Sequence, residues 1–216
     1  YTYATNQIVS DENQAKVALF NRPSDRKMTQ AYKDLLTKEV TQTRENCDVL
    51  IAMMHWGNEF TYDISTQQEE VSQLLSDLGV DIIIGNHSHC SQPMEWINNN
   101  RTLCMYSLGN FVSADPIVDR THQEFKNAYN VSMMVSLDIV KENNQISIQN
   151  IDYIPVINYY DEHLQNFKLI PYDQYTTQYE TTHYHYQNGL TKKWIEETYQ
   201  QLIPQSLSDH VLQKTA

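Results

Sequence analysis

The sequence predicts an α/β fold that contains a pair of buried parallel strands, and three segments predict it. Residues 48–56 read DVLIAMMHW, apolar on both faces of a strand, and residues 80–85 read VDIIIG, a second buried run. Short apolar runs between polar segments are typical of strands that are covered on both sides. Residues 66–78 between them show helical spacing, and the order strand, helix, strand is the signature of a parallel pair.

A helix is expected before the first buried strand. The first 24 residues show no regular pattern, and apolar residues then recur at helical spacing from Met28 to Leu36. Ser24 or Asp25 is a suitable N-cap, so we expect the helix to run from there to about Asn46.

The helix between the strands is expected to place Val71, Leu74, Leu75 and Leu78 on its inner face. Gly79 comes next, and glycine readily adopts the left-handed conformation that ends many helices. This helix should therefore stop directly before the second buried strand.

A third short strand is expected at residues 103–110, LCMYSLGN, after the turn NNNR. Its connection from residue 90 is too short for a full crossover helix, so the sequence leaves the direction of this strand open. The segment WINNN that precedes it is interpreted as packing and a turn.

The C-terminal part of the chain has a different pattern. Residues 131–140 and 145–155 partly alternate between apolar and polar, and KENN at 141–144 is expected to join them as a hairpin. Residues 156–190 are rich in Tyr, Gln and Asn, and a final helix is expected from Thr191 to about Ile203, stopped by Pro204. We therefore divide the chain into a main domain, residues 1–155, and a Tyr-rich extension with a terminal helix, residues 156–216.

The composition restricts the classes of partner. The chain has 216 residues, a formal net charge of −12 and a pI near 5.0. An acidic surface argues against nucleic acid and against attraction to an anionic membrane surface. Apolar runs are far shorter than the ~20 residues of a membrane span. The chain begins without Met, and we expect it to be a fragment with an anchor or signal upstream.

Polar residues occur at the C-terminal ends of all three expected strands. His55 is at the end of the first strand, His87 and His89 come just after the second, and Asn110 is at the end of the third. Ligands of open α/β sheets bind at the carboxyl ends of parallel strands. Residues i and i+2 of an extended segment point the same way, so His87 and His89 are expected to face one site with Ser88 turned away. Imidazole suits divalent first-row metals, and three histidines form a partial set of ligands.

A structural interpretation of these histidines stays open, because a single His after a strand is commonly a loop residue bonded to backbone. A catalytic metal centre usually includes carboxylates, yet the nearby acids have no ligand spacing: Glu59, Asp63, Asp81 and Glu95. The remaining histidines follow no buried strand and are expected to be solvated loop residues: His122, His163, His183, His185 and His210.

Three cysteines occur, Cys47, Cys90 and Cys104, without a CxxC pair. This odd and sparse set is neither a disulfide framework nor a zinc ribbon. Cys90 adjoins the GNHSH segment and is a candidate site residue, with a small buried hydrophobe as the competing interpretation.

Three blocks carry a family resemblance: MHWGNEF at 54–60, GVDIIIGNHSHCSQPMEW at 79–96 and YSLGNFVS at 106–113. They resemble, in order and spacing, the bacterial capsule-synthesis CapA family, also called the poly-γ-glutamate synthesis or PgsA-like family. The opening YTYATN and Gln67 fit the same pattern, which covers about residues 1–115.

The resemblance implies the C-terminal part of a calcineurin-like metallophosphoesterase sandwich, with two β-sheets flanked by helices. It implies that His55, His87 and His89 are the late metal ligands, and that the early ligands precede Tyr1. Ser88 replaces the usual Pro, and Phe60 replaces Tyr. Two glycines of the opening block are also replaced, by Ala4 and Gln7.

The function expected from the resemblance is capsule biosynthesis with a metal-dependent hydrolase site. The expected cofactors are divalent metal ions, Mn, Zn or Fe, and it stays open whether this chain alone holds them. His55 would complete the ligand shell, Glu59 would transfer protons or support a ligand, and Asn110 would donate to a substrate oxygen. The expected substrate is anionic, either a phosphoester or polyglutamate.

The resemblance also implies membrane subunits of a capsule synthase as partners and a membrane-anchored location at the cell surface. The first alternative is a non-catalytic extracellular accessory for polymer export or anchoring. The second is a generic α/β binding domain, which predicts that His55 lies far from His87.

Overall fold

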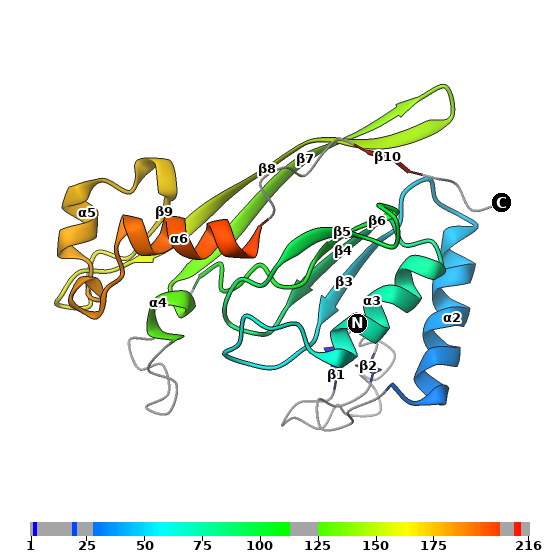
Figure 1. Cartoon of the computed structure of the whole chain (residues 1–216), viewed down its shortest axis with the longest axis horizontal. Helices are drawn as coiled ribbons and strands as arrows, with labels where there is room; N and C mark the ends of the chain where they lie inside the picture. Colours follow the sequence, from blue (N-terminus) through cyan, green and yellow to red (C-terminus); the bar gives the residue numbers. More distant parts are fainter. Residues whose placement is uncertain (1, 4–18, 21–27, 113–124, 204–209, 213–216) are drawn as a thin grey trace.

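The computed structural model describes residues 2–3, 19–20, 28–112, 125–203 and 210–212. It contains two β-sheets flanked by helices, as Figure 1 shows, and this confirms the predicted mixed α/β class. The proposed caps Ser24 and Asp25, the departures at Ala4 and Gln7, and His122 lie outside the described residues. Among the described residues, no helix is both long and apolar enough to cross a membrane.

The first sheet has the strand order β2-β1-β3-β4-β6-β5, and all its pairs are parallel except β5 with β6. The third predicted strand, now β6, therefore runs parallel to β4. The strand β5 was not expected, because WINNN suggested a turn. The bounds are β1 Thr2–Tyr3, β2 Leu19–Phe20, β3 Ile51–His55, β4 Ile82–Asn86, β5 Met94–Ile97 and β6 Thr102–Met105.

The second sheet is antiparallel, with the order β10-β8-β7 and β9 paired to β8. Its centre is the predicted hairpin, which turns through Asn143 and Asn144, both in the left-handed conformation. Two successive left-handed residues are typical of the tight turn that matches strand twist. The bounds are β7 Val131–Glu142, β8 Gln145–Tyr159, β9 Lys168–Pro171 and β10 His210–Leu212. The strand β8 therefore runs across the division that we placed between residues 155 and 156.

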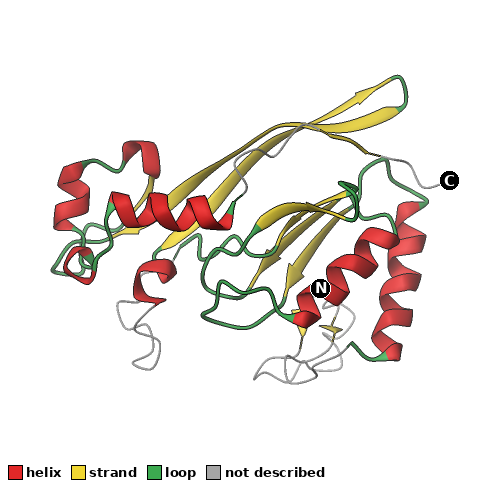
Figure 2. Cartoon of the chain, in the orientation of Figure 1, coloured by secondary structure: helices red, strands yellow, loops and turns green. Residues whose placement is uncertain are grey.

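Helices cover the outer face of the first sheet and one end of the second (Figure 2). The predicted helices are confirmed, although α2 begins at Gln30 and not at Ser24 or Asp25. In Figure 1 the helices α2 and α3 lie beside the first sheet, and α5 and α6 lie at the far end of the hairpin. The bounds are α2 Gln30–Arg44, α3 Thr66–Asp77, α4 Lys126–Tyr129, α5 Thr177–Thr182 and α6 Lys192–Leu202, with short 3₁₀ turns η2 Tyr172–Gln174 and η3 Tyr186–Asn188.

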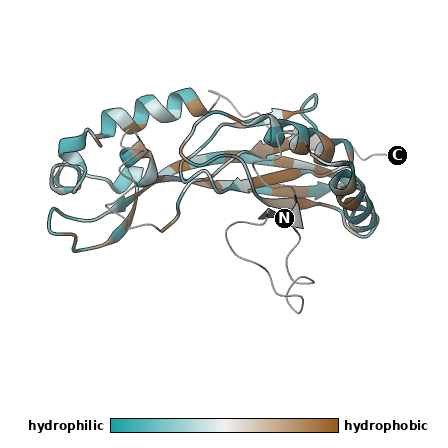
Figure 3. Cartoon of the chain, turned by 90° about the horizontal axis from the view of Figure 1, so that it is seen from below, coloured by the Kyte–Doolittle hydropathy of each residue, from teal (hydrophilic) through white to brown (hydrophobic). Residues whose placement is uncertain are grey.

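Two hydrophobic cores lie on the two faces of the first sheet. One packs Leu36 of α2 and Leu75 of α3 against Ile83 of β4. The other packs the opposite face, including Ile82 and Leu103, against the hairpin and α6. Figure 3 shows the corresponding brown strands running through the middle of the molecule, with teal on the outer helix faces. This layering fixes which strand ends meet at one edge.

The strand β3 was expected to be buried on both faces, and that expectation was wrong. Within β3, Ala52 and Met54 are buried, but Ile51 is 44% exposed and Met53 is 69% exposed. The reason is positional, because the core under the hairpin includes residues of β4, β5 and β6 and none of β3. An apolar composition alone did not reveal that the second sheet stops short of this strand.

The helix α3 has well-defined ends. Ser65 and Gln68 form a capping box, in which each side chain binds the other residue's backbone N–H. At the C-terminus, the N–H groups of Gly79 and Val80 bond back to the carbonyls of Ser76 and Leu75, which is a Schellman motif. Local hydrogen bonds at both ends, as well as the apolar face, therefore define this helix.

Replacing Ser65 with Ala should lower the free energy of unfolding by about 1 kcal/mol, because an N–H at the start of α3 loses its acceptor. Urea unfolding of the two proteins measures this difference. Thr41→Ala is the control, since Thr41 is an exposed residue in the interior of α2 and should cost less than half as much. Equal costs at the two positions would contradict the capping role of Ser65.

Candidate functional site

The candidate site lies at the carboxyl edge of β3 and β4. These strands pair in parallel with His55 opposite Asn86, so the end of β3 meets the start of the loop that carries His87 and His89. The N–H of Trp56 also donates to the carbonyl oxygen of Asn86 at 3.1 Å. The topology therefore brings together the three histidines that sequence reasoning proposed.

The rings of His55 and His87 are in direct contact. The Nε2 atom of His55 lies 3.0 Å from the Nδ1 atom of His87, and the ring centroids are 4.6 Å apart. This contact contradicts the generic-domain alternative, which predicted a large separation. In the chain, 32 positions separate the two residues, and only the parallel pairing of β3 with β4 makes them neighbours.

The ring of His89 is held by Asn110. The Nδ1 atom of His89 lies 2.9 Å from Oδ1 of Asn110, and the Asn110 amide donates to the carbonyls of His89 and Tyr129, each at 3.2 Å. Because Oδ1 accepts, His89 carries its proton on Nδ1, and its Nε2 atom faces outward. Nε2 lies 3.6 Å from Oε1 of Glu59. In this structure Asn110 thus orients an imidazole.

The loop from His87 to His89 is not extended, so the i and i+2 argument gave the wrong conformation. His87 has a φ of 106° and His89 a φ of 59°, both in the left-handed region. Ser88 between them is buried, and its hydroxyl donates to the carbonyl of Cys90 at 2.7 Å. The two imidazoles still lie close, with centroids 6.1 Å apart. Such backbone strain is typical of functional loops.

Burial and mutual repulsion keep the contacting imidazoles neutral. Burial and, to a smaller extent, the neighbouring His55 and His89 lower the pKa of His87 to about 4. The pKa of His55 is also lowered, mainly by burial and then by His89, although Glu59 opposes this. A neutral imidazole keeps one nitrogen lone pair, which is the form that binds a metal.

The pair of nitrogens fits a metal in part. Imidazole nitrogens bound tetrahedrally at ~2.0–2.1 Å lie about 3.3 Å apart, close to the observed 3.0 Å between His55 and His87. Within the described part of the chain, however, no group of three or more His, Cys, Asp or Glu side chains is arranged to hold a metal ion. The chain thus supplies two converging nitrogen donors and a third oriented imidazole.

A buried support beneath the site was missed by sequence reasoning. Trp56 is fully buried, and its Nε1–H donates to the carbonyl of Tyr106 at 2.8 Å. Gly85 leaves room for this bond, since a Cβ atom there would lie 2.0 Å from the Tyr106 oxygen. The signal was present in the blocks MHWG and IIIG, which place Trp56 and Gly85 beside the histidines.

The loop that carries Glu59 is tied down by two glutamines. Gln92 donates to the carbonyls of Thr61 and Asp63, at 3.1 and 3.0 Å, and accepts from Gln68 at 2.8 Å. Gln67, the residue noted in the sequence, is also buried, but these bonds belong to Gln68. The loop therefore holds Glu59 near His89 through buried polar contacts.

Phe60 and Tyr129 form an aromatic wall around His89. Each ring centroid lies 5.6 Å from that of His89, and the N–H of Phe60 donates to the carbonyl of Ser88 at 2.9 Å. Phe60 is the position where the family has Tyr. The wall limits the positions that the imidazole ring can take.

Cys90 has the structural role that the competing interpretation gave it. The side chain is fully buried, its Sγ–H donates to the carbonyl of Thr61 at 3.2 Å, and burial raises its pKa to about 11. Asp81 is likewise structural, since it pairs with Arg44 at 2.6 Å. Neither side chain is available as a ligand in this arrangement.

His183 and His185 are buried, so the expectation of a solvated loop was wrong for them. Their exposed fractions are 3% and 1%. The Tyr-rich tract, which showed little pattern, folds over them with α5 and α6 and so excludes water. His163 is exposed as expected, and for His210 the structure describes only the backbone strand.

The family to which this chain is similar matches the first half of the chain. Residues 1–115 match the family described as bacterial capsule synthesis protein PGA_cap. The chain is 37% identical over 73 residues to "PGA biosynthesis protein CapA" of Bacillus subtilis (strain 168), covering 34% of this chain and 19% of that protein. It is 34% identical over 83 residues to "Capsule biosynthesis protein CapA" of Bacillus anthracis, covering 37% and 20%. The matches thus span about a fifth of each relative.

Proposed function

Because the chain belongs to the bacterial capsule synthesis family PGA_cap, we propose that it acts in capsule biosynthesis and contributes part of a metal-dependent hydrolase site. The observation that carries the proposal is the approach of His55 Nε2 and His87 Nδ1 to 3.0 Å at a shared strand edge. The names of the relatives support the capsule assignment.

The metal would be held by His55 and His87, with His89 beside them. A divalent ion such as Mn, Zn or Fe supplies Lewis-acid polarisation of a phosphoryl or carbonyl oxygen when bound. Each imidazole must present a lone pair, and the lowered pKa values of His55 and His87 favour that form. Asn110 fixes the proton of His89 on Nδ1, so the lone pair is on Nε2, the nitrogen that lies 3.6 Å from the Glu59 carboxylate.

Glu59 is the candidate proton carrier of the site. Its carboxylate lies 3.6 Å from Nε2 of His89 and its side chain is 52% exposed, so it reaches both the imidazole and solvent. Such a position suits transfer of a proton to or from a substrate group. The bonds from Gln92 and Phe60 hold the loop that carries it.

The proposed substrate is an anionic polymer or ester, either polyglutamate or a phosphoester. The net charge of −12 repels such a substrate at long range, so the local positive charge of the metal would have to attract it. The proposal also includes membrane subunits of a capsule synthase as partners, and an anchored position at the cell surface.

Metal binding by the full chain tests the proposal. We expect elemental analysis after loading with Mn²⁺, Zn²⁺ or Fe²⁺ to show bound metal, and His55→Ala or His87→Ala to weaken binding at least about tenfold, because each removes one converging nitrogen. His163→Ala is the matched control, since His163 is exposed at a distant turn. Equal metal content in all four proteins would refute the role of the pair.

Hydrolysis assays separate the enzyme from the non-catalytic accessory. The probes are a chromogenic phosphodiester and poly-γ-glutamate, each with the metal-loaded chain and with His87→Ala. Hydrolysis that the substitution abolishes supports the enzyme. Absence of metal and of hydrolysis, together with loss of capsule in cells that lack the protein, would support the accessory.

A further inference from the structure

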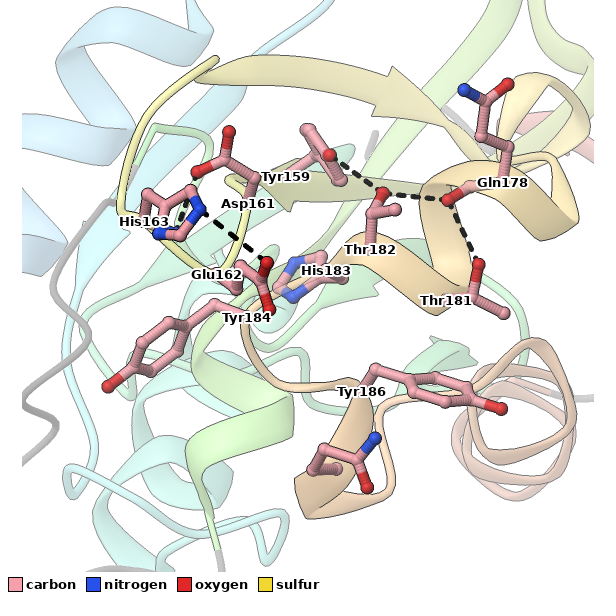
Figure 4. A pocket seen from close by; sticks show the side chains of 11 residues that line it. Tyr159, Asp161, Glu162, His163, Gln178, Thr181, Thr182, His183, Tyr184 and Tyr186 are labelled. Carbon is pink, nitrogen blue, oxygen red and sulfur yellow. Dashed lines mark hydrogen bonds and ion pairs between the residues drawn. The ribbon is translucent and has the colours of Figure 1, made fainter.

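A polar cavity lies in the C-terminal part of the molecule, away from the histidine edge. It has a volume of about 380 Å³ and is formed by the end of β8, the turn at residues 161–163, α5 and residues 183–187 (Figure 4). This volume lies within the range of small-molecule sites in proteins. All of these residues follow the segment that matches the family, so the family assignment does not explain the cavity.

Tyrosine rings form much of its wall. Figure 4 shows Tyr184 and Tyr186 on two sides of the cavity, with Tyr159 above, and Tyr184 is 37% exposed. The hydroxyl of Tyr159 is engaged with Thr182 at 2.9 Å, which fixes that ring. A tyrosine offers a flat apolar face and a polar tip with little conformational entropy to lose.

Amide and carboxylate groups complete the lining. Gln178 on α5 and Gln187 on η3 are exposed, and each amide offers both hydrogen-bond donors and acceptors. Glu162 lies on the opposite wall, with its side chain 81% exposed. The cavity therefore presents donors and acceptors interleaved with aromatic faces.

The charges of the lining disfavour an anionic ligand, since Asp161 and Glu162 are both acidic and the imidazole of His163 lies 3.6 Å from the Glu162 carboxylate. Among the described residues that line this cavity, none is Lys or Arg. His183 at the floor of the cavity does not supply a positive charge in their place. Its Nε2 donates to the Asn158 carbonyl at 3.0 Å and its Nδ1 accepts from the N–H of His185 at 2.9 Å. Asp161 accepts from the N–H groups of its own turn and remains ionised. Polyglutamate or a phosphoester would thus meet negative charge here.

We propose that this cavity is a binding site for a neutral carbohydrate. Sugar rings carry hydroxyls that both donate and accept, which matches the amides and Glu162, and their C–H faces match the rings of Tyr184 and Tyr186. An organic cation also suits Glu162 and the tyrosines, but its ammonium group accepts no hydrogen bond and leaves the amide N–H groups of Gln178 and Gln187 unmatched. The mixed lining therefore favours the sugar. The site is separate from the proposed hydrolase function.

Titration with defined oligosaccharides tests this site. Chitotriose, cellotriose and maltotriose are each added to the full chain, and binding is followed by saturation-transfer NMR and calorimetry. At least one should bind, and Tyr184→Ala or Tyr186→Ala should weaken that affinity about tenfold because a stacking face is lost. Tyr184→Phe keeps the face and should weaken it much less.

Four further variants make the outcome decisive. Gln187→Ala should weaken binding without removing a ring, whereas Gln201→Ala on the exposed face of α6 should leave it unchanged. His55→Ala should also leave it unchanged, which separates this site from the metal proposal. The inference is overturned if no trisaccharide binds, if the Ala variants bind like wild type, or if only choline binds and Glu162→Gln abolishes that binding.

Discussion

Replacing Gly85 with Ala is expected to destabilise the protein severely, by about 4 kcal/mol or more in the free energy of unfolding. A Cβ atom at this position would lie 2.0 Å from the carbonyl oxygen of Tyr106 and 2.5 Å from Nε1 of Trp56. The Tyr106 oxygen is backbone, and it also accepts the Trp56 hydrogen bond at 2.8 Å. Relief of the clash would therefore require β4 to move away from β6.

The same change should damage the site as well as the stability. Residue 85 directly precedes Asn86 and the histidine loop, so a shift of β4 moves His87 relative to His55. Urea unfolding measures the stability loss, and metal analysis of any folded fraction measures the effect on the pair. We expect both to fall together.

Gly189→Ala is the matched control for this experiment. Gly189 has a φ of 86°, but the nearest atom to a Cβ there is 3.9 Å away. Only the left-handed conformation is then penalised, at about 1 kcal/mol. A Gly85→Ala protein that unfolds at the same urea concentration as Gly189→Ala would show that the close approach to Tyr106 is not needed.

The second large effect is expected from acid. Burial lowers the pKa of both His183 and His185 to about 4, from an ordinary value of 6.5. Between these values the unfolded chain binds more protons than the folded chain, so stability falls as pH falls from about 6.5 towards 4. For the two residues together, the loss at pH 5 is on the order of 3 kcal/mol.

The hydrogen bonds of His183 and His185 also favour the neutral imidazoles, independently of burial. Nδ1 of His183 accepts the N–H of His185 at 2.9 Å, and Nδ1 of His185 lies 3.0 Å from the amide nitrogen of Asn188, which donates to it. Protonation would place two donors face to face at either position. The nearby Lys126 further opposes a charge on His185.

Urea unfolding at pH 7 and pH 5 tests the acid effect. His185→Gln should reduce the difference in unfolding free energy between the two pH values. His163→Gln should leave that difference unchanged, because His163 is exposed. His55 and His87 also have lowered pKa values and contribute to the pH response of the wild type. The test therefore compares how much each variant changes the difference in unfolding free energy between pH 7 and pH 5. A wild-type pH response in His185→Gln would contradict the assignment.

Several elements were predictable because their determinants are local. The helix α3 has its cap at Ser65, its apolar face and its stop at Gly79 within one short segment. The hairpin of β7 and β8 follows from alternation and a polar turn. The helix α6 was expected to begin at Thr191, and it begins at Lys192 with Thr191 as its N-cap. Such signals need no knowledge of the rest of the chain.

The elements that were mispredicted depend on distant partners. Apolar composition suggested that β3 is covered on both faces, yet the hairpin covers only its neighbours. Polar composition suggested that His183 and His185 are solvated, yet aromatic rings from distant positions enclose them, including those of Tyr159 and Tyr160. Burial is set by what packs above a residue, which periodicity does not report.

By itself, the sequence determined the family and the mixed α/β class, and it singled out the three histidines of the candidate site, because these depend on residue types at fixed spacing. Only the tertiary structure decided that β6 runs parallel to β4, that His55 touches His87, and that Asn110 orients His89. Those facts depend on pairing between distant strands and on the left-handed backbone at His87 and His89, which residue spacing does not report. The tyrosine-lined cavity could not be predicted from residue spacing either, because its walls come from segments that meet only after folding.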